Sequence, residues 1–192
     1  MIRCEHISKS FDGKTVLDDI SATFGQGVIN MVIGQSGSGK TVLVKCLSGL
    51  YEVDKGDIYY NDTLCTKLSF KDRKSLRREV GMIIQGGALL GSSTVEENIR
   101  FPLDMFTKMS EKEKKDRVDF CLERVNLSDA HKLYPSELSG GMTKRVAIAR
   151  AIVMNSKYLF CDEPNSGLDP VTSIVIDDLI KEITKEYNIT TI

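Results

Sequence analysis

The sequence lacks three features that would restrict its function at once: an excess of charge, a long apolar run and a metal-binding pattern. Its formal net charge is -1, so no long-range electrostatic field attracts it to nucleic acid or anionic lipid. The protein could recognise such a partner only through a local patch of charge on its surface. No apolar stretch approaches the roughly 18 to 20 residues that span a bilayer, and the start, MIRCEHISKSFDG, lacks the apolar run of a signal peptide. If the protein works at a membrane, we expect it to associate with the membrane peripherally.

The cysteines show no metal-binding spacing. Cys4, Cys46, Cys65, Cys121 and Cys161 are odd in number, lie in apolar surroundings and form no C-x-x-C pair or cluster with histidine, which argues against zinc. We interpret them as buried, reduced thiols of a cytosolic protein. The 192 residues, 41% of them hydrophobic, can bury one core, so we expect a single domain, with room for a smaller inserted subdomain.

Two short apolar runs are predicted to be strands. The run from Val28 to Ile33 stops at a glycine, and the run that begins at Lys157 stops at paired acids. Both are typical of buried strands in a mainly parallel sheet, where ligand sites lie at the carboxyl ends. The last residues, NITTI, resemble the start of another strand.

Helical spacing occurs in three places. Ser110 and Glu113 form a capping-box pattern, while Asp169 and Pro170 are a predicted helix cap and first-turn proline. Apolar residues line one face of each predicted helix: Leu43, Leu47 and Leu50; Val118, Cys121, Leu122 and Val125; and Ile176, Leu179, Ile180, Ile183 and Tyr187. Residues 86–151 look mostly helical, and we predict a helical subdomain there, inside a single domain that covers 1–192.

A glycine-rich stretch, GQSGSGKT, provides the first candidate site. Gly34, Gly39, Lys40 and Thr41 satisfy the pattern G-x-x-x-x-G-K-S/T, with a predicted strand before it and a predicted helix after it. Glycines let backbone N–H groups turn inward around phosphate oxygens, Lys40 adds positive charge, and the Thr41 hydroxyl can bind magnesium. The alternative is a glycine-rich turn with an incidental lysine, which the flanking elements disfavour.

Paired acids provide the second candidate. Asp162 and Glu163 follow a predicted strand. In a P-loop fold, an aspartate at this place holds magnesium through water, and the adjacent carboxylate polarises the attacking water. The alternative is that both acids only cap the next turn.

A second glycine pair, in PSELSGGMTKR, identifies a family. LSGG, together with DE and the P-loop, resembles the signature combination of ABC-type ATPases, and the resemblance covers essentially the whole sequence. It implies an α/β fold: a P-loop NTPase core with a mainly parallel sheet, an antiparallel β subdomain near the N-terminus and an inserted helical subdomain. It also implies a head-to-tail homodimer around two ATP molecules, in which Ser139, Gly140 and Gly141 of one subunit face the P-loop of the other.

The resemblance assigns site residues position by position. Glu163 and Gln85 are the expected catalytic residues, and Thr41, Gln85 and Asp162 are the expected Mg2+ ligands. The expected ATP-binding residues are Phe11, Gly34, Gln35, Ser36, Gly37, Ser38, Gly39, Lys40, Thr41, Val42, Ser139, Gly140 and Gly141. Phe11 matches the aromatic residue that stacks on adenine, where tyrosine is commoner, and Ser166 to Asp169 resembles the loop at the dimer seam. Each assignment has an ordinary structural alternative. Gln85 could be only a surface residue, Phe11 could belong to the core, and Asp169 could be only the cap of the helix that follows it.

One family element is absent from the sequence. The family's switch histidine follows the strand that begins ITTI, and neither His6 nor His131 lies in that context. We therefore expect a longer natural chain, and we predict that the 192 residues bind ATP more reliably than they hydrolyse it.

Finer resemblance suggests a type of transporter. Met142 stands where the family usually has glutamine, and with QGGALL and TVEENIRFPL it resembles the ATPases of Mla/Mce-type phospholipid transporters. That implies a separate membrane permease, lipid-binding subunits, no nucleic acid, and a cytoplasmic location, peripheral on the inner face of the cell membrane. The permease is expected to dock along 85–102, with Leu89, Leu90, Ile99 and Leu103 as candidate lining or, alternatively, as core.

Other functions remain open from the sequence, and one of them is the ATPase of another kind of ABC importer or exporter. A soluble ABC ATPase of DNA repair, translation or iron–sulfur assembly would normally bring a coiled coil, tandem cassettes or a basic face, none of which is visible. A GTPase or small-molecule kinase fits worse, since no N-K-x-D motif follows the P-loop. A regulatory nucleotide-binding module is a further alternative, and it predicts that replacing Glu163 by Gln changes no activity.

Overall fold

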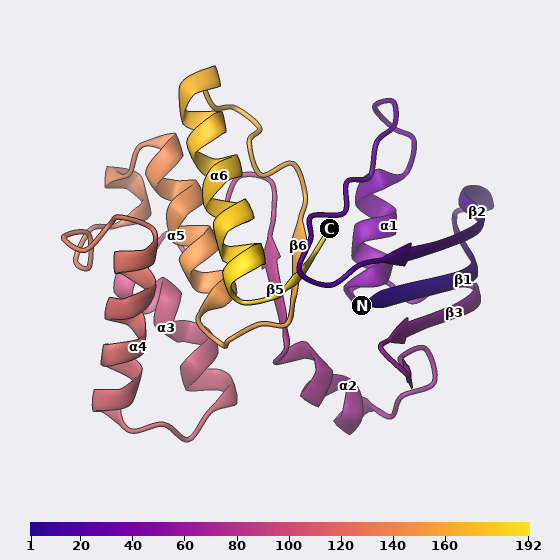
Figure 1. Ribbon diagram of the computed structural model, residues 1–192, viewed down its shortest axis with the longest axis horizontal. Helices are drawn as coiled ribbons and strands as arrows, with labels where there is room; N and C mark the ends of the chain where they lie inside the picture. Colours follow the sequence, from indigo (N-terminus) through magenta and orange to yellow (C-terminus); the bar gives the residue numbers. More distant parts are fainter.

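The computed structural model describes residues 1–192, with the exception of the side chain of Phe70. The strands in chain order are β1 (Ile2–Phe11), β2 (Lys14–Phe24), β3 (Lys55–Tyr60), β4 (Thr63–Leu64), β5 (Val80–Ile83), β6 (Tyr158–Cys161) and β7 (Thr190–Thr191). The helices are α1 (Lys40–Leu47), α2 (Phe70–Arg77), α3 (Val95–Phe106), α4 (Glu111–Arg124), the short 3-10 helix η1 (Pro135–Glu137), α5 (Gly140–Ile152) and α6 (Pro170–Glu186). Figure 1 shows α1 and the N-terminal sheet on one side of β5 and β6, and α5 and α6 on the other.

The N-terminal sheet is antiparallel, in the order β2-β1-β3-β4. A tight turn at Asp12 and Gly13, both with positive φ (49° and 79°), joins β1 to β2, as expected of a short hairpin connection. Alternate residues such as Cys4 and Leu17 point inward and pack against Leu47 of α1. The antiparallel β subdomain expected near the N-terminus is confirmed.

The second sheet is parallel, in the order β5-β6-β7. Along β6 the side chains alternate between two cores: Tyr158 and Phe160 pack on the α1 side, whereas Leu159 packs on the helical side. The C-terminal residues join this sheet, because Ile192 N–H donates to the carbonyl of Leu159 at 2.9 Å. The P-loop NTPase class and the strand expected at NITTI are confirmed.

The segment 28–33 departs from the sequence prediction of a buried strand. Only Ile29 forms a bridge, to Thr191, and Met31 and Ile33 are 77% and 85% exposed. The segment runs along the outer edge of the parallel sheet, where Asn30 N–H donates to the carbonyl of Thr191 at 2.8 Å. Within the described residues no strand pairs with its other side, so apolar character alone does not bury it.

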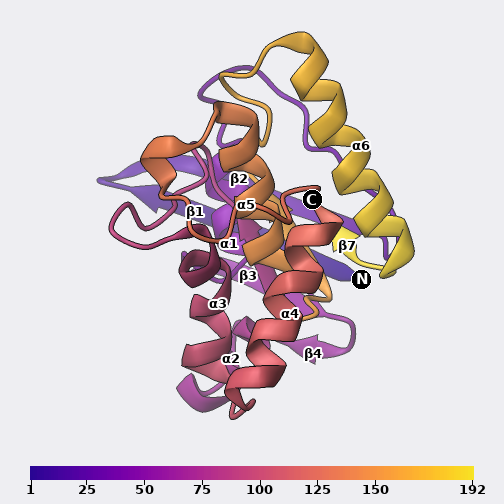
Figure 2. The ribbon, with the colours of Figure 1, turned by 90° about the vertical axis from the view of Figure 1, so that its left-hand side faces the viewer.

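Helices α3, α4, α5 and α6 pack around one large core. The capping box of Ser110 and Glu113 is present, as predicted, and Asp169 caps α6 through the N–H groups of Val171 and Thr172. All the apolar residues predicted to line α4 and α6 are buried except Tyr187, and Leu50 lies exposed beyond the end of α1. Figure 2 looks onto α3 and α4, which lie side by side in front of the strands.

The core shared by these helices also includes residues of the parallel sheet. Ile83, Leu159 and Ile176 pack in the same cluster as the apolar faces of α3, α4 and α5. The subdomain limits 86–151 therefore stay a prediction. None of the helices in the described chain is both long enough and apolar enough to span a bilayer.

All five cysteines are free. Cys4, Cys46 and Cys121 are buried, while Cys65 and Cys161 are partly buried. Burial raises the pKa of the Cys46, Cys65 and Cys121 thiols to about 11 and that of Cys161 to about 12. These thiols are therefore protonated near neutral pH.

Candidate functional site

The first glycine loop, Gly34 to Gly39, leads directly into α1. Gly39 is the N-cap residue, with φ of 94°, and no side chain caps this end of the helix. A Cβ at Gly39 would lie 3.1 Å from the carbonyl oxygen of Val16 and 3.2 Å from Leu17 Cδ2, so the β2 strand supports the loop from behind. The first N–H groups of α1 thus remain open to an anion.

Lys40 lies folded over its own loop. Its ammonium donates to the carbonyl oxygens of Gly34 and Gln35, both at 2.9 Å. These neutral acceptors hold the ammonium at the mouth of the loop. A phosphate there would offer a stronger, charge-assisted bond.

The foot of the loop meets the end of β6. Thr41 Oγ1 donates to Asp162 Oδ1 at 2.9 Å, although the two residues are 121 positions apart. Asp162 is 8% exposed, and its backbone N–H donates to the carbonyl of Ile83 at the end of β5, at 2.9 Å. Two of the three predicted metal ligands, Thr41 and Asp162, are therefore brought together at the carboxyl ends of two parallel strands.

This oxygen set fits Mg2+ bound together with a nucleotide. Among the described side chains, no group of three or more His, Cys, Asp or Glu residues could hold a metal alone. One hydroxyl and one carboxylate are typical of Mg2+, which usually binds through few protein ligands, substrate phosphates and water. The open donors of the glycine loop and the Thr41–Asp162 pair therefore fit Mg-ATP jointly.

Glu163 is exposed next to this pair, and its backbone is strained. Its φ is 49°, in a region that non-glycine residues rarely adopt and that often marks functional sites.

Nearby lies Lys144 of α5, which is 4% exposed and whose Nζ has no hydrogen-bond partner in the described part of the chain. Burial lowers the pKa of Lys144, and the charge of Glu163 opposes that shift. No pattern in the sequence singles out Lys144.

Gln85 lies exposed just past β5. Because Asp162 pairs with Ile83, the ends of β5 and β6 are neighbours, and Gln85 begins a loop near the acids. The loop continues through Gly86, Gly87 and Ala88, all with positive φ. The structure places Gln85 at the same sheet edge as Asp162.

The second glycine loop has a different construction. Ser139 Oγ accepts from Met142 N–H at 3.2 Å and caps α5. Gly140 packs against Leu168, and a Cβ at Gly141 would lie 2.8 Å from Thr172 Cγ2. In Figure 1, α5 and α1 lie on opposite sides of β5 and β6, so one chain does not bring its two glycine loops together.

The predicted base-stacking residue lies at the end of β1. Phe11 is 38% exposed and contacts Tyr51 edge-on, with ring centroids 5.5 Å apart. Lys9 Nζ lies 5.4 Å from the Phe11 centroid and also donates to Asp54. Phe11 is therefore available to a planar ligand, with Tyr51 as a buttress that the sequence did not reveal.

In the region where a permease is expected to dock, the structure decides between groove lining and core for two of the four candidate residues. Ile99 and Leu103 are fully buried core residues of α3 and cannot line a groove, because their face of the helix points to α5. Leu90, Phe101 and Met105 are the exposed apolar residues of this region. Any docking surface here would involve the outer face of α3.

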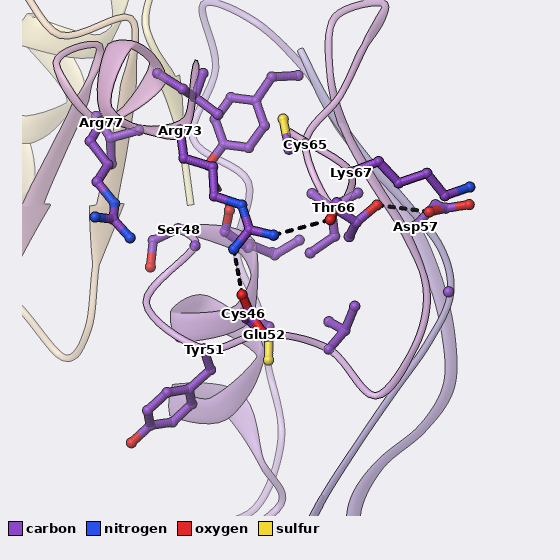
Figure 3. Close-up of a pocket in the computed structure, with 18 of the residues that line it drawn as sticks. Cys46, Ser48, Tyr51, Glu52, Asp57, Cys65, Thr66, Lys67, Arg73 and Arg77 are labelled. Atoms are coloured by element: carbon purple, nitrogen blue, oxygen red, sulfur yellow. Dashed lines mark hydrogen bonds and ion pairs between the residues drawn. The ribbon is translucent and has the colours of Figure 1, made fainter. Parts of the chain in front are cut away.

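A cavity lies elsewhere, between the end of α1, β3 and α2 (Figure 3). It has a volume of about 250 Å³, and none of the predicted site residues lines it. Arg73 crosses it by donating to Glu52 at 2.5 Å and to the carbonyl of Thr66 at 3.1 Å. The nucleotide chemistry is instead expected on the open surface of the glycine loop.

Known proteins are similar to this chain in sequence and in structure. The family described as ABC transporter matches residues 17–166. Methionine import ATP-binding protein MetN 4 of Oceanobacillus iheyensis is 44% identical over 194 residues, which cover 99% of this chain and 56% of the relative. Probable ribonucleotide transport ATP-binding protein mkl of Mycobacterium tuberculosis is 37% identical over 189 residues, covering 98% of this chain and 53% of the relative. The chain thus spans about half the length of these curated relatives.

A solved structure agrees closely as well. It is the ATP-binding cassette MJ0796, described as a dimeric, post-hydrolysis state bound to ADP and Pi. The TM-score is 0.89 at 28% identity, over 100% of this chain and 85% of that chain.

Proposed function

The chain belongs to the ABC transporter family, and from this premise we propose that it is the ATP-binding and ATP-hydrolysing part of a transporter. The observation that carries the proposal is the contact between Thr41 Oγ1 and Asp162 Oδ1. It joins two sequence motifs at the mouth of an uncapped helix, which is the arrangement that a magnesium nucleotide requires.

The proposed roles follow from position. Residues 34–42 donate backbone N–H groups to the phosphates, Lys40 exchanges its carbonyl partners for phosphate, and Phe11 stacks on the base. Thr41, Asp162 and Gln85 would hold Mg2+, which would neutralise charge on the phosphates. Glu163 orients the attacking water and accepts its proton.

A second copy completes the proposed site. Within one chain the Ser139–Gly141 loop and the glycine loop before α1 lie on opposite sides of the parallel strands. The N–H groups at the start of α5 can then bind only a phosphate of a nucleotide that is held by the glycine loop of another subunit. The dimeric description of MJ0796 supports a homodimer that ATP holds together.

The type of transporter is proposed from kinship, and the Mla/Mce expectation is corrected. The relative with 44% identity is named for methionine import and the mycobacterial one for ribonucleotide transport, and neither name supports phospholipid or lipid-binding subunits. We infer an importer ATPase, with methionine as the first substrate to test, which works with a separate permease at the inner face of the membrane. The exposed Leu90, Phe101 and Met105 are the proposed contact with that permease.

The test is single-turnover hydrolysis with protein in excess over Mg-ATP. Glu163→Gln is expected to bind ATP as the parent does but to hydrolyse it at least about 100-fold more slowly, since it removes a general base. Glu182→Gln, an exposed change on α6, is the control. Equal rates for Glu163→Gln and the parent would overturn the proposed function and favour a regulatory nucleotide-binding module.

A further inference from the structure

The loop after Gln85 is held in an unfavourable backbone conformation. Gly86, Gly87 and Ala88 have φ of 77°, 78° and 44° in succession. Alanine rarely adopts such a φ, so the surrounding structure must impose it. What holds this loop therefore also decides where Gln85 lies.

Arg150, in the last turn of α5, provides that restraint. Its Nη1 donates to the carbonyl of Ala88 and its Nη2 to the carbonyl of Gly87, both at 2.9 Å. The planar guanidinium matches two neighbouring carbonyls in a way that lysine cannot. Among the described residues, these are the only side-chain hydrogen bonds between α5 and this loop.

Packing along the same face of α5 supports the contact. A Cβ at Gly87 would lie 3.0 Å from Thr143 Cγ2 and 3.8 Å from Ala147 Cβ. Thr143, Ala147 and Arg150 are spaced four and three residues apart, so they form one stripe that begins next to the second glycine pair. Gly87 is buried against this stripe.

The other end of the loop belongs to α3. Asn98 is fully buried and makes four hydrogen bonds, accepting from Leu90 N–H and donating to the carbonyls of Leu90, Ser93 and Thr94. The loop is thus fastened twice: near Gln85 to α5, and near Leu90 to α3. The first fastening is the one made by α5 itself, the helix that carries Gly140 and Gly141.

We propose that Arg150 is a positioning residue that locks the Gln85 loop to α5, so that Gln85 and the second glycine pair move as one unit. The proposal rests on the proposed function, because Gln85 matters only if Mg-ATP binds. Arg150 itself touches no reacting group. It acts by fixing the backbone from which Gln85 extends.

Hydrogen exchange in the nucleotide-free chain tests the lock directly. Gly87 N–H donates to the carbonyl of Ile84 at 2.9 Å and reports the state of the loop. In Arg150→Met we expect its exchange to rise at least about tenfold, with exchange in the Asn98-bound part unchanged. Arg150→Lys is expected to restore part of the protection. Arg124→Met, which loses an ion pair to Glu186 on another surface, is the matched control and should leave Gly87 unaffected.

Single-turnover hydrolysis tests the consequence. Arg150→Met is expected to lower the rate about tenfold while the affinity for ATP without Mg2+ stays constant, because the glycine loop before α1 is untouched. Unchanged exchange at Gly87, or raised exchange with an unchanged rate, would overturn the role of Arg150. Failure of the parent chain to hydrolyse ATP at all would instead overturn the proposed function.

Discussion

The two glycine loops use the same residue for opposite purposes. At Gly39 the glycine supplies a left-handed backbone, with φ of 94°, and leaves the helix without a side-chain cap. At Gly140 and Gly141 the backbone is helical and capped by Ser139, and the missing side chains let α5 lie close to Leu168 and Thr172. The first loop is open to a ligand, whereas in the second Gly141 is fitted closely against Thr172 of its own chain while Ser139 and Gly140 stay exposed. Glycine in a motif can therefore mean ligand access or close packing, and only the contacts decide which.

The largest expected effect on nucleotide affinity comes from breaking the open loop. Gly39→Ala adds a Cβ at a positive φ, 3.1 Å from the carbonyl of Val16, so the loop must move. We expect affinity for a fluorescent ATP analogue to fall by at least about tenfold. Gly91→Ala is the control, because a Cβ there meets nothing within 4 Å. Full affinity in Gly39→Ala would show that the left-handed cap is dispensable.

Breaking the packed loop should reduce stability instead. The new Cβ of Gly141→Ala would lie 2.8 Å from Thr172 Cγ2, and we expect a loss of about 1 to 3 kcal/mol in the free energy of unfolding. Adding Thr172→Ser removes the opposing methyl group but keeps the hydroxyl that donates to Asp169, so the double variant should recover most of the loss. Denaturant unfolding measures both. No recovery would place the clash elsewhere.

Replacing Lys144, which is also on α5, should change the free energy of unfolding in the opposite direction. Replacing its buried, unpartnered ammonium with methionine should raise the free energy of unfolding by about 1 to 3 kcal/mol near neutral pH. Because burial lowers the folded pKa of Lys144 below its ordinary value of 10.5, the parent should gain stability as pH rises from the folded pKa toward 10.5. The advantage of Lys144→Met should therefore shrink over that range. An advantage that is constant with pH would exclude the lysine charge as its cause.

The smallest expected effect is that of the cap itself. Ser139→Ala removes the acceptor for Met142 N–H and should cost about 1 kcal/mol of stability. ATP affinity of the isolated chain should not change, because this loop lies away from the phosphate loop of its own chain. Thermal unfolding and the same fluorescent titration check the two parts. A weaker affinity would contradict the separation of the two loops.

Contiguous motifs made most of the site predictable. GQSGSGKT, DE and LSGG each carry their chemistry within a few residues, and the contact between Thr41 and Asp162 follows once both are placed at strand ends. The caps at Ser110 and Asp169 are equally local. Local patterns of this kind need no knowledge of distant partners.

The features that could not be predicted depend on contacts between residues that are distant in the sequence. The run 28–33 has strand composition but lies at an edge of the sheet. The sequence left open whether Ile99 and Leu103 line a groove or belong to the core, and only their burial on the face of α3 that meets α5 decides for the core. Arg150 lies 63 residues from the carbonyl of Gly87 that it binds, and nothing in the sequence around it indicates this contact. Tyr51 and Lys144 likewise gain their meaning only from neighbours distant in sequence.

The chemistry of the five thiols makes the molecule convenient for labelling. Since burial raises the pKa of Cys46, Cys65, Cys121 and Cys161 to 11 or above, maleimide reagents should react slowly with them near neutral pH. A cysteine introduced on an exposed position of α6 would carry a fluorophore selectively. Motion between subunits could then be followed by energy transfer without first removing the native sulfur atoms.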